Sequence, residues 1–283
     1  MPALSIVIAA RNAERFLGDA VASVEPGLDC EILLADGGST DATLTIAARD
    51  PRLRIVSRSD GGIYDGMNRG IAAATGDAVL LLNSDDLLPP GAVEAALLRL
   101  RADTSAGWVS GTALFGEELA SAVERTHRSP LSAEGALFGV PAINARLFRR
   151  DLLHGIGPIR TDLGLASDRE FLARVARSGR RGLALGTPLY FYRVHEGSRT
   201  ISGDRSSFAR VHRAEEMLSE GLLTSNEDTE LQRLAAASGT VASLKRGLRG
   251  RDVSVVMGAL SRPAQITRGA RLSLRWRGQL SGY

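Results

Sequence analysis

Four polar residues directly follow the most apolar run of the chain, residues 79–82, and their types suit a metal ion. They are Asn83, Ser84, Asp85 and Asp86. Two adjacent carboxylates repel each other unless water or a cation neutralises them. Mg²⁺ or Mn²⁺ fits such a position, because these hard ions take one or two carboxylates together with phosphate oxygens and waters. The alternative is a turn before the helix that starts near Pro89, where acidic residues favour the positive helix end.

Asp36 is another carboxylate at the end of an apolar run, and two glycines follow it. The sharp turn that they allow would present the carboxylate at the edge of a sheet. There it could accept a hydrogen bond from a nucleobase or a ribose hydroxyl. The alternative reading of this segment is capping of the next helix by Ser39, Thr40 or Asp41.

A glycine-rich segment, residues 60–70, combines backbone freedom with polar groups on the first turns of a helix. Main-chain amides at a helix start, together with Asn68 or Arg69, suit a diphosphate. Asp60, after the preceding strand, is a further candidate for contact with the same ligand. The chain contains no Gly-x-x-x-x-Gly-Lys-Ser/Thr loop and no Gly-x-Gly-x-x-Gly signature, so ATPases and dehydrogenases are disfavoured.

The elements that position these residues alternate between strands and helices. Short runs rich in Val, Ile and Leu predict buried strands, and apolar residues three and four apart predict helices packed on them. We expect strands at 5–10, 31–35, 53–57, 78–83, near 108–114 and at 183–192, helices at 13–24, 41–48, 64–74, 92–101 and 168–178, and a strand or short helix at 142–150. This alternation predicts an α/β fold with a mostly parallel central sheet flanked by helices, which binds ligands at the carboxyl ends of its strands.

The composition is that of a folded globular protein, with 44% hydrophobic and 24% charged residues among 283. Cys30 is the only cysteine, which excludes a disulfide framework and a multi-cysteine zinc cluster and favours a reducing compartment. No apolar run approaches the roughly 18 residues of a membrane span. The apolar start of the chain lacks a basic segment before it, so we expect a buried strand and not a signal peptide. The sequence therefore predicts a cytoplasmic protein.

The net charge of +3 conceals a basic C-terminal segment. From residue 241 onward there are nine basic residues and one acidic residue, a net charge of +8, so the first 240 residues carry −5. Helices are expected at 206–218 and 228–248, which divides the chain into a core at 1–203 and a helical extension at 204–283. Apolar residues among the arginines of the extension favour an anionic membrane surface, and a solvated surface is the alternative. Nucleic acid is disfavoured because stacking aromatic residues are scarce there.

Most of residues 4–200 resembles family 2 glycosyltransferases with the GT-A fold. The motifs are most similar to those of enzymes of bacterial exopolysaccharide biosynthesis. The resemblance lies in residues 5–12, 35–41, 63–70, 75–77, 83–86, 141–144, 166–170 and 192–198. It implies a single GT-A domain, a nucleotide-diphosphate sugar as donor, a divalent metal, Mg²⁺ or Mn²⁺, and single displacement with inversion at the sugar carbon. In that family an Asp at the position of Asp36 binds the base.

The resemblance also implies roles for the residues of the candidate site. The Asp-x-Asp motif of the family, which holds the metal and the diphosphate, falls on residues 83–85. Here Asn83 replaces the first acid and Ser84 follows it, so Asp85 is the expected metal ligand. Asp168 lies where the family has its catalytic base, the carboxylate that takes the proton of the acceptor hydroxyl. The family often has Glu before that base where this chain has Ser167, so Glu170 is a rival.

Two further residues, Arg193 and His195, follow the strand expected at 183–192. From there Arg193 could contact the departing diphosphate, and His195 the metal, because positive charge stabilises the leaving group. The expected acceptor is a glycan or a polyprenyl-linked glycan, which would bring the enzyme to the inner face of the plasma membrane as a peripheral protein. We expect a hexosyltransferase-like enzyme that adds one sugar per encounter. A processive synthase is disfavoured, because Leu272 stands where the Gln-x-x-Arg-Trp motif requires Gln.

Two other function classes remain open at this point. A sugar-nucleotidyltransferase has a related sheet and metal site, but it should carry a glycine-rich phosphate signature with a nearby Lys, and the chain has none. A nucleotide-sugar-binding or scaffold protein with impaired catalysis is kept open by Asn83 and Ser167. The donor sugar, its base and the linkage depend on loop shape, and these motifs do not specify them.

Overall fold

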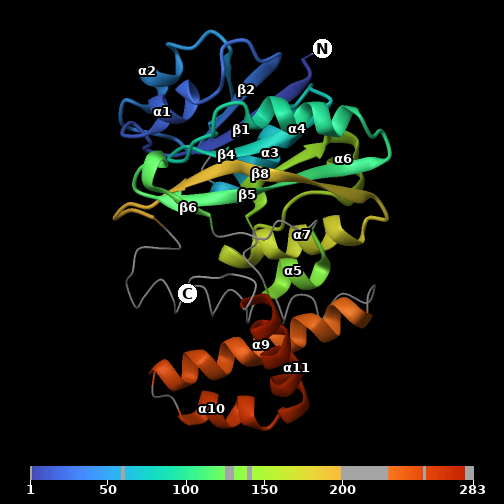
Figure 1. The fold of residues 1–283 in the computed structure, drawn as a ribbon. Helices are drawn as coiled ribbons and strands as arrows, with labels where there is room; N and C mark the ends of the chain where they lie inside the picture. The colour runs from blue at the N-terminus through green and yellow to red at the C-terminus, as the bar shows by residue number, and fades with distance from the viewer. Residues whose placement is uncertain are drawn as a thin grey trace. The chain divides into compact units, whose positions relative to one another are not determined.

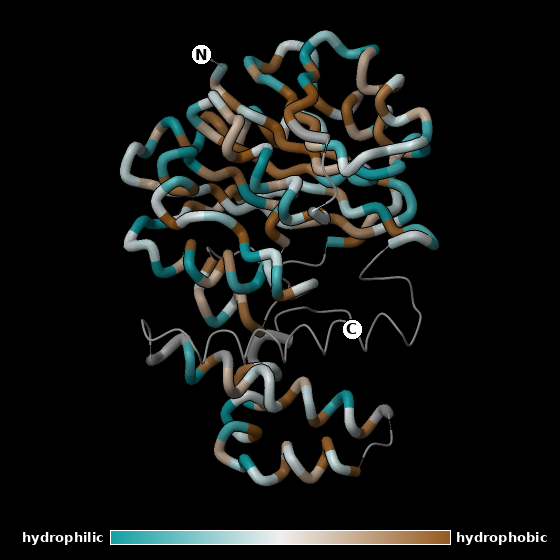
Figure 2. The backbone as a smooth tube through the Cα atoms, turned by 180° about the vertical axis from the view of Figure 1, so that it is seen from behind, coloured by the Kyte–Doolittle hydropathy of each residue, from teal (hydrophilic) through white to brown (hydrophobic). Residues whose placement is uncertain are grey.

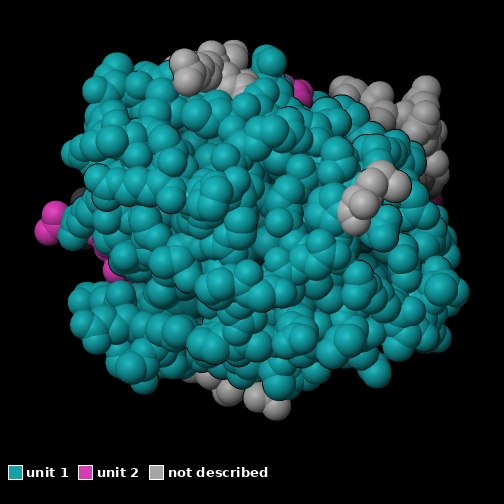
Figure 3. All heavy atoms as spheres, turned by 90° about the horizontal axis from the view of Figure 1, so that it is seen from above, with its two compact units in different colours: residues 1–131, 142–161, 175–193 teal, residues 132–141, 162–174, 194–283 magenta. Residues whose placement is uncertain are grey.

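The computed structural model describes residues 2–58, 61–124, 131–138, 142–198, 229–250 and 253–277. The chain divides into two compact units, which Figure 3 colours separately. Unit 1 comprises residues 1–131, 142–161 and 175–193, and unit 2 comprises residues 132–141, 162–174 and 194–283. The predicted boundary between residues 203 and 204 and the predicted helix at 206–218 lie outside the described residues.

Unit 1 is built on a mixed sheet, which has eight strands in the described part of the chain. The strands are β1 (Leu4–Ala10), β2 (Cys30–Asp36), β3 (Leu53–Arg58), β4 (Ala78–Asn83), β5 (Ala106–Gly116), β6 (Val123–Glu124), β7 (Arg146–Arg149) and β8 (Arg181–Arg193). Their order is β3-β2-β1-β4-β7-β5-β6, and β8 pairs with β5. The pairs β1–β2, β1–β4, β2–β3 and β5–β8 are parallel, and β7 and β6 run antiparallel to their neighbours. The predicted α/β fold with a mostly parallel sheet is thus confirmed.

Helices cover both faces of this sheet (Figure 1). They are α1 (Leu17–Ala22), α2 (Thr43–Ala47), α3 (Ile63–Ala73), α4 (Ala92–Arg101) and α6 (Arg150–Ile156). All seven residues of β1 are buried, as expected for a strand covered on both sides. The side chains of α1 and α4 share one core with Ile6 and Ile8, whereas α3 lies against Val7 on the opposite face. Figure 2 shows the apolar strands running through the middle of this unit.

The approach of α3 to β1 explains a glycine in the middle of a helix. A Cβ atom on Gly70 would lie 2.2 Å from Cγ1 of Val7, so no larger residue fits without displacing the helix or the Val7 side chain. Glycine costs roughly 1 kcal/mol relative to alanine inside a helix. The close packing of helix on strand therefore outweighs local helix propensity at this position.

One predicted helix, at 13–24, is shorter in the structure, where α1 begins at Leu17. The backbone N–H groups of residues 12–14 donate to side chains of the loop after β2 and of the first residue of α2. The distances are 2.9, 2.7 and 3.0 Å to Ser39 Oγ, Thr43 Oγ1 and Asp41 Oδ2. Asn12 has a φ of 49°, which is outside the helical region. Contacts between two loops, and not local propensity, therefore set the start of α1.

Unit 2 is helical in the residues that the structure describes. It contains α5 (Ala133–Phe138), most of α7 (Ser167–Arg177), α9 (Thr229–Gly250), α10 (Val253–Leu260) and α11 (Pro263–Arg277). Both α10 and α11 pack against α9 (Figure 1). A Cβ on Gly269 of α11 would lie 2.5 Å from the carbonyl oxygen of Ala237, so the two helices approach closely there. None of the helices described is both long and apolar enough to pass through a bilayer.

Candidate active site at the carboxyl edge of the sheet

Three parallel strands of unit 1 end side by side. Asp36, the last residue of β2, pairs with Ala10 at the end of β1. Asn83, the last residue of β4, pairs with Ala9 on the other side of β1. The loops that follow these strands therefore start at one edge of the sheet, where ligands bind in open α/β folds. The structure brings Asp36 and the residues 83–86 to this edge.

The carboxylate of Asp36 shapes the loop after β2. Asp36 is 1% exposed, and its oxygens accept hydrogen bonds from the N–H of Gly38 at 3.0 Å, the N–H of Ser39 at 3.1 Å and the hydroxyl of Ser39 at 2.5 Å. Gly38 has a φ of 79°, which favours glycine. In the loop after β1, Oδ1 of Asn12 accepts the N–H of Thr40 at 2.9 Å. Asp36 and Asn12 thus fix the two loops against each other, and the contact of Asp36 with a nucleobase stays a prediction.

The end of β4 is held by a buried carboxylate, Asp86, which is 1% exposed. Its Oδ1 accepts the backbone N–H of Arg193 at 2.7 Å, and its Oδ2 accepts Nδ2 of Asn83 at 2.9 Å and the hydroxyl of Tyr190. Nδ2 of Asn144 in turn donates to Oδ1 of Asn83 at 3.3 Å and to the carbonyl of Leu81 at 3.1 Å. Asp86 therefore ties β8 to the end of β4.

This network explains why an amide stands at position 83. The side chain of Asn83 donates to Asp86 through its nitrogen and accepts from Asn144 through its oxygen. An aspartate at this position has no hydrogen to donate, and its charge would face the buried carboxylate of Asp86. Asn83, at the position where the Asp-x-Asp motif has its first acid, is therefore a side chain that can pair with Asp86.

Burial and the neighbouring charge of Asp85 raise the pKa of Asp86 from 3.8 to about 7, although its hydrogen bonds act in the opposite direction. In the unfolded chain the carboxyl group ionises near pH 4, so folding takes up a proton between about pH 4 and pH 7. The contribution of Asp86 to the free energy of unfolding is present at low pH and is lost as the pH rises through 7, a change of up to about 4 kcal/mol.

We expect denaturant unfolding of the wild type and of Asp86→Asn, measured from pH 5 to pH 8, to show this proton. The free energy of unfolding of the wild type should fall relative to that of the variant as the pH rises. The comparison cancels carboxylates present in both proteins, such as Asp50, whose pKa is held low by its hydrogen bonds with Arg52. Equal pH slopes in the two proteins would contradict the assignment of the proton to Asp86.

The residues at this edge fit a divalent ion that is bound together with a phosphate-containing substrate. Among the described residues, no three His, Cys, Asp or Glu side chains are grouped so that they could hold a metal by themselves. Mg²⁺ usually takes one or two carboxylates and completes its shell with substrate phosphates and waters. Three donors already engage Asp86, so Asp85, half-buried beside it, stays the predicted metal ligand of the pair.

The predicted diphosphate residues on α3 make internal contacts. Asn68 pairs with both backbone groups of Ile159, donating to its carbonyl at 2.7 Å and accepting its N–H at 2.8 Å. Nε of Arg69 donates to Asp65 at 2.8 Å, one helical turn earlier, and the Arg69 side chain is 48% exposed. Asp60 lies outside the described residues, and Ser84 is half-buried at the end of β4. Their contacts with a donor stay predictions.

Arg193, at the end of β8, contacts the loop after β1 and helix α1. Its guanidinium carbon lies 4.6 Å from the centre of the Phe16 ring, and its Nη1 lies 3.0 Å from Oδ2 of Asp19. The guanidinium of Arg15 lies at the same distance from the Phe16 ring. A cation over an aromatic face is attracted by the ring. Arg193 thus joins β8 to the loop after β1, and its contact with a diphosphate stays a prediction.

The remaining predicted residues belong to unit 2. Asp168 is half-buried in the first turn of α7 and accepts the N–H of Arg169 at 2.8 Å. Glu170, 4% exposed, is engaged by Arg174 through both oxygens, at 2.7 and 2.9 Å. Nδ1 of His195 accepts the N–H of Gly197 at 3.1 Å. Glu170 therefore has a structural partner in its own helix, and the approach of Asp168 and His195 to the residues of unit 1 stays a prediction.

Sequence reasoning missed Tyr190 and assigned no role to Asn144. Tyr190 is buried. Its hydroxyl donates to Asp86 and accepts the N–H of Asn83 at 3.4 Å. It stands 104 residues from Asp86, and no local pattern distinguishes it from a core tyrosine. Asn144 lies in one of the segments that carry the family resemblance, and a buried polar residue between apolar neighbours was the signal available there.

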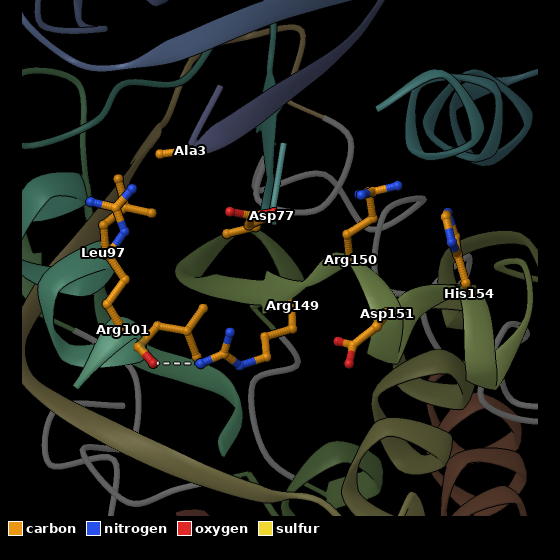
Figure 4. Close-up of a pocket in the computed structure, with 10 residues that line it drawn as sticks. Ala3, Asp77, Leu97, Arg101, Arg149, Arg150, Asp151 and His154 are labelled. Atoms are coloured by element: carbon orange, nitrogen blue, oxygen red, sulfur yellow. Dashed lines mark hydrogen bonds between the residues drawn. The ribbon is translucent and has the colours of Figure 1, made fainter. Parts of the chain in front are cut away.

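A separate hollow of about 360 Å³ lies at the amino ends of β1 and β4, the edge opposite to the candidate site (Figure 4). It is lined by Ala3, Asp77, Ala78, Leu97, Leu100, Arg101, Arg149, Arg150, Asp151 and His154. The guanidinium of Arg149 crosses it to the end of α4, where it donates to the carbonyl of Leu100 at 2.7 Å. None of the predicted site residues lines this hollow, which we therefore assign to the packing of α4 and α6.

Curated relatives match this chain over much of its length. EpsH of Bacillus subtilis is 27% identical over 216 residues, 70% of this chain and 62% of EpsH. A PGL/p-HBAD biosynthesis glycosyltransferase of Mycobacterium bovis is 32% identical over 182 residues, 61% of this chain and 69% of the relative. The chain thus spans less than two thirds of EpsH, and it spans 17% of the chondroitin synthase of Escherichia coli, with 36% identity.

Solved structures share the fold. TarS residues 1–349 of S. aureus, in complex with UDP, superposes with a TM-score of 0.63 at 14% identity, over 93% of this chain and 91% of that one. The mannosyltransferase PcManGT of Pyrobaculum calidifontis, in complex with GDP-Man and Mn²⁺, gives 0.59 at 20% identity, over 99% and 83%. The sequence profile described as Glycosyl transferase family 2 matches residues 5–155, more than half of the chain. With the GT-A sheet and the polar residues at its carboxyl edge, this match shows that the chain belongs to glycosyl transferase family 2.

Proposed function

We propose that this protein is an inverting, non-processive glycosyltransferase that moves one sugar per encounter from a nucleotide-diphosphate donor to a glycan or lipid-linked acceptor. The observation that carries the proposal is the shared edge of β1, β2 and β4, where Asp36 and Asp85 start neighbouring loops. The complexes of TarS with UDP and with UDP-GlcNAc, and of PcManGT with GDP-Man and Mn²⁺, support a nucleotide-sugar donor and a divalent ion.

The proposed roles follow from the chemistry of each side chain. The loop built on Asp36 receives the base, and the polar residues at the start of α3 and Arg193 contact the diphosphate. Asp85 would hold the divalent ion. When bound, such an ion neutralises the charge that develops on the leaving group. His195 contributes a ring nitrogen to the same charged region.

Asp168 is the proposed base for the transfer. A carboxylate takes the proton of the acceptor hydroxyl while that oxygen attacks the sugar carbon, and the bond to the diphosphate breaks on the opposite side. The configuration at the sugar carbon is inverted because the attack is a single displacement. The bidentate pairing of Glu170 with Arg174 supports Asp168 over Glu170 for this role.

A polyprenyl-linked acceptor would place the reaction at the inner face of the plasma membrane. The sequences of residues 60–68 and 82–86, which resemble enzymes of bacterial exopolysaccharide biosynthesis, support a role in that process. The sugar-nucleotidyltransferase and the scaffold with impaired catalysis are the alternatives that an assay must separate from transfer.

A thermal-shift screen of UDP, GDP, ADP and CDP, each with Mn²⁺ and with EDTA, tests the proposal. We expect one nucleotide to raise the melting temperature by about 5–10 °C when present at about 100 times its Kd, and to do so only with the ion. The matching sugar nucleotide, given an acceptor, should then release its diphosphate. Nucleotide binding without turnover of any donor would favour the scaffold, and release of pyrophosphate from a nucleoside triphosphate and a sugar phosphate would favour the nucleotidyltransferase.

A further inference from the structure

Exposed apolar side chains gather in one short part of unit 2. Six large hydrophobic residues of the described chain are at least half exposed, and two of them, Leu98 and Val123, belong to unit 1. The other four fall within thirteen consecutive residues. They are Leu248 (62%), Val253 (72%), Met257 (60%) and Leu260 (50%). Single exposed apolar residues are ordinary, but a cluster indicates an interaction surface.

Three of these residues lie on one side of α10, which we name the α10 face: Val253, Met257 and Leu260. They are spaced four and three residues apart, so they stack along one side of a helix. The opposite side of α10 is packed on α9. Ala259 is 3% exposed, and a Cβ on Gly247 of α9 would lie 3.1 Å from Cγ1 of Val255. The α10 face is therefore not a core surface of the helical unit.

The surroundings of the α10 face are basic. Residues 241–283 carry a net charge of +8, and α10 itself has no charged residue. Arg262 lies two residues after the end of α10, and Arg268 and Arg271 lie three residues apart on α11. All three are exposed, and none forms an ion pair with a described residue. An apolar face in a segment that also carries exposed, uncompensated arginines matches an anionic lipid surface in both hydrophobicity and charge.

We infer that the α10 face docks this protein on an anionic membrane, with α10 in the plane of the bilayer surface. Eight residues of helix span about 12 Å, too short to cross the hydrocarbon core. Val253, Met257 and Leu260 enter the boundary of headgroups and acyl chains, and the three arginines contact lipid phosphates. The aliphatic character of the face disfavours nucleic acid, which binds stacking aromatic residues. The docking gives a lipid-linked acceptor of the proposed function a place, but does not depend on that function.

Sedimentation of the full chain with vesicles tests the inference. We expect binding to vesicles of 70% phosphatidylcholine and 30% phosphatidylglycerol, and at least tenfold weaker binding to pure phosphatidylcholine or in 0.5 M salt. The triple variant Val253→Ser, Met257→Ser, Leu260→Ser should bind the anionic vesicles at least tenfold more weakly. The matched control is Leu98→Ser, which removes an equally exposed side chain from unit 1 and should leave binding unchanged.

The double variant Arg268→Gln, Arg271→Gln separates charge from burial, and we expect about tenfold or more weaker binding to the anionic vesicles only. Met257→Glu alone replaces the triple variant if that protein fails to fold. Unchanged vesicle binding in the α10 variant that folds would overturn the inference. So would a wild-type dimer that the triple variant converts to a monomer without any loss of vesicle binding, since a second copy would then cover the face. Nucleotide binding is read separately in the thermal-shift screen, so failure of the docking and failure of the proposed transfer are distinguishable.

Discussion

Replacement of Asp168 by Asn is expected to lower kcat for sugar transfer by about 10²–10⁴-fold, the usual contribution of a general base. The amide keeps the size of the carboxylate and its hydrogen bond from the N–H of Arg169, but it cannot take a proton. Donor affinity should change by less than about twofold, because the base acts on the acceptor. Initial rates at saturating donor, together with calorimetric titration of the nucleotide, measure both quantities.

Two carboxylates in the same unit serve as controls for Asp168. Glu170→Gln should lower the melting temperature, because it breaks a buried bidentate pair with Arg174, while the rate per folded molecule stays near that of the wild type. Asp162→Asn changes an exposed carboxylate a few residues before α7 and should leave the rate per folded molecule unchanged. Full activity in Asp168→Asn would assign the base elsewhere, and a parallel loss of donor binding would assign Asp168 a role in the donor site.

The strands of the sheet could be predicted because their sequence signals are local. The run before Asn83 is uninterruptedly apolar, polar residues end it, and β4 ends where those residues begin. The same holds for β2 and Asp36. Since parallel strands end at one edge, the neighbourhood of their loops followed from topology alone.

Contacts between residues far apart in the chain could not be predicted in this way. Asn68 and Ile159 are 91 residues apart, and Tyr190 and Asp86 are 104 residues apart. In each pair a side chain forms a hydrogen bond with a residue of a distant loop or strand. Such a contact leaves no periodic pattern in the sequence. The early start predicted for α1 failed for the same reason, because Ser39 and Thr43 take the N–H groups of the residues before it.

The type of residue at a strand end also predicts where that residue lies more reliably than what it does. Asp36 was predicted to contact a nucleotide, and in the structure its oxygens hold the turn that follows it. The two uses are compatible only if the turn presents its own amides and hydroxyls to the ligand. For residues 83–86 the division is sharper, since the buried Asp86 holds the backbone and the half-buried Asp85 is the residue predicted to contact the donor through an ion.

That division predicts a large effect of Asp85→Asn. In the presence of Mn²⁺ the variant should bind the nucleoside diphosphate at least about 100-fold more weakly than the wild type, and transfer should fall at least as far. Loss of partners in the outer shell of a metal costs about 10–100-fold, and the loss of a direct ligand costs no less. Binding measured in EDTA should be equal in the two proteins, because the removed charge acts through the ion.

The control for Asp85 lies at the other end of the same strand. Asp77→Asn changes an exposed carboxylate just before β4 begins, at the opposite edge of the sheet, and should leave the ion-dependent part of nucleotide binding intact. Calorimetric titration with and without Mn²⁺ measures this part directly. If Asp85→Asn kept its ion-dependent binding, the ion would have to be held elsewhere, and Asp86 could take that place only by giving up its hydrogen bonds from Arg193, Asn83 and Tyr190.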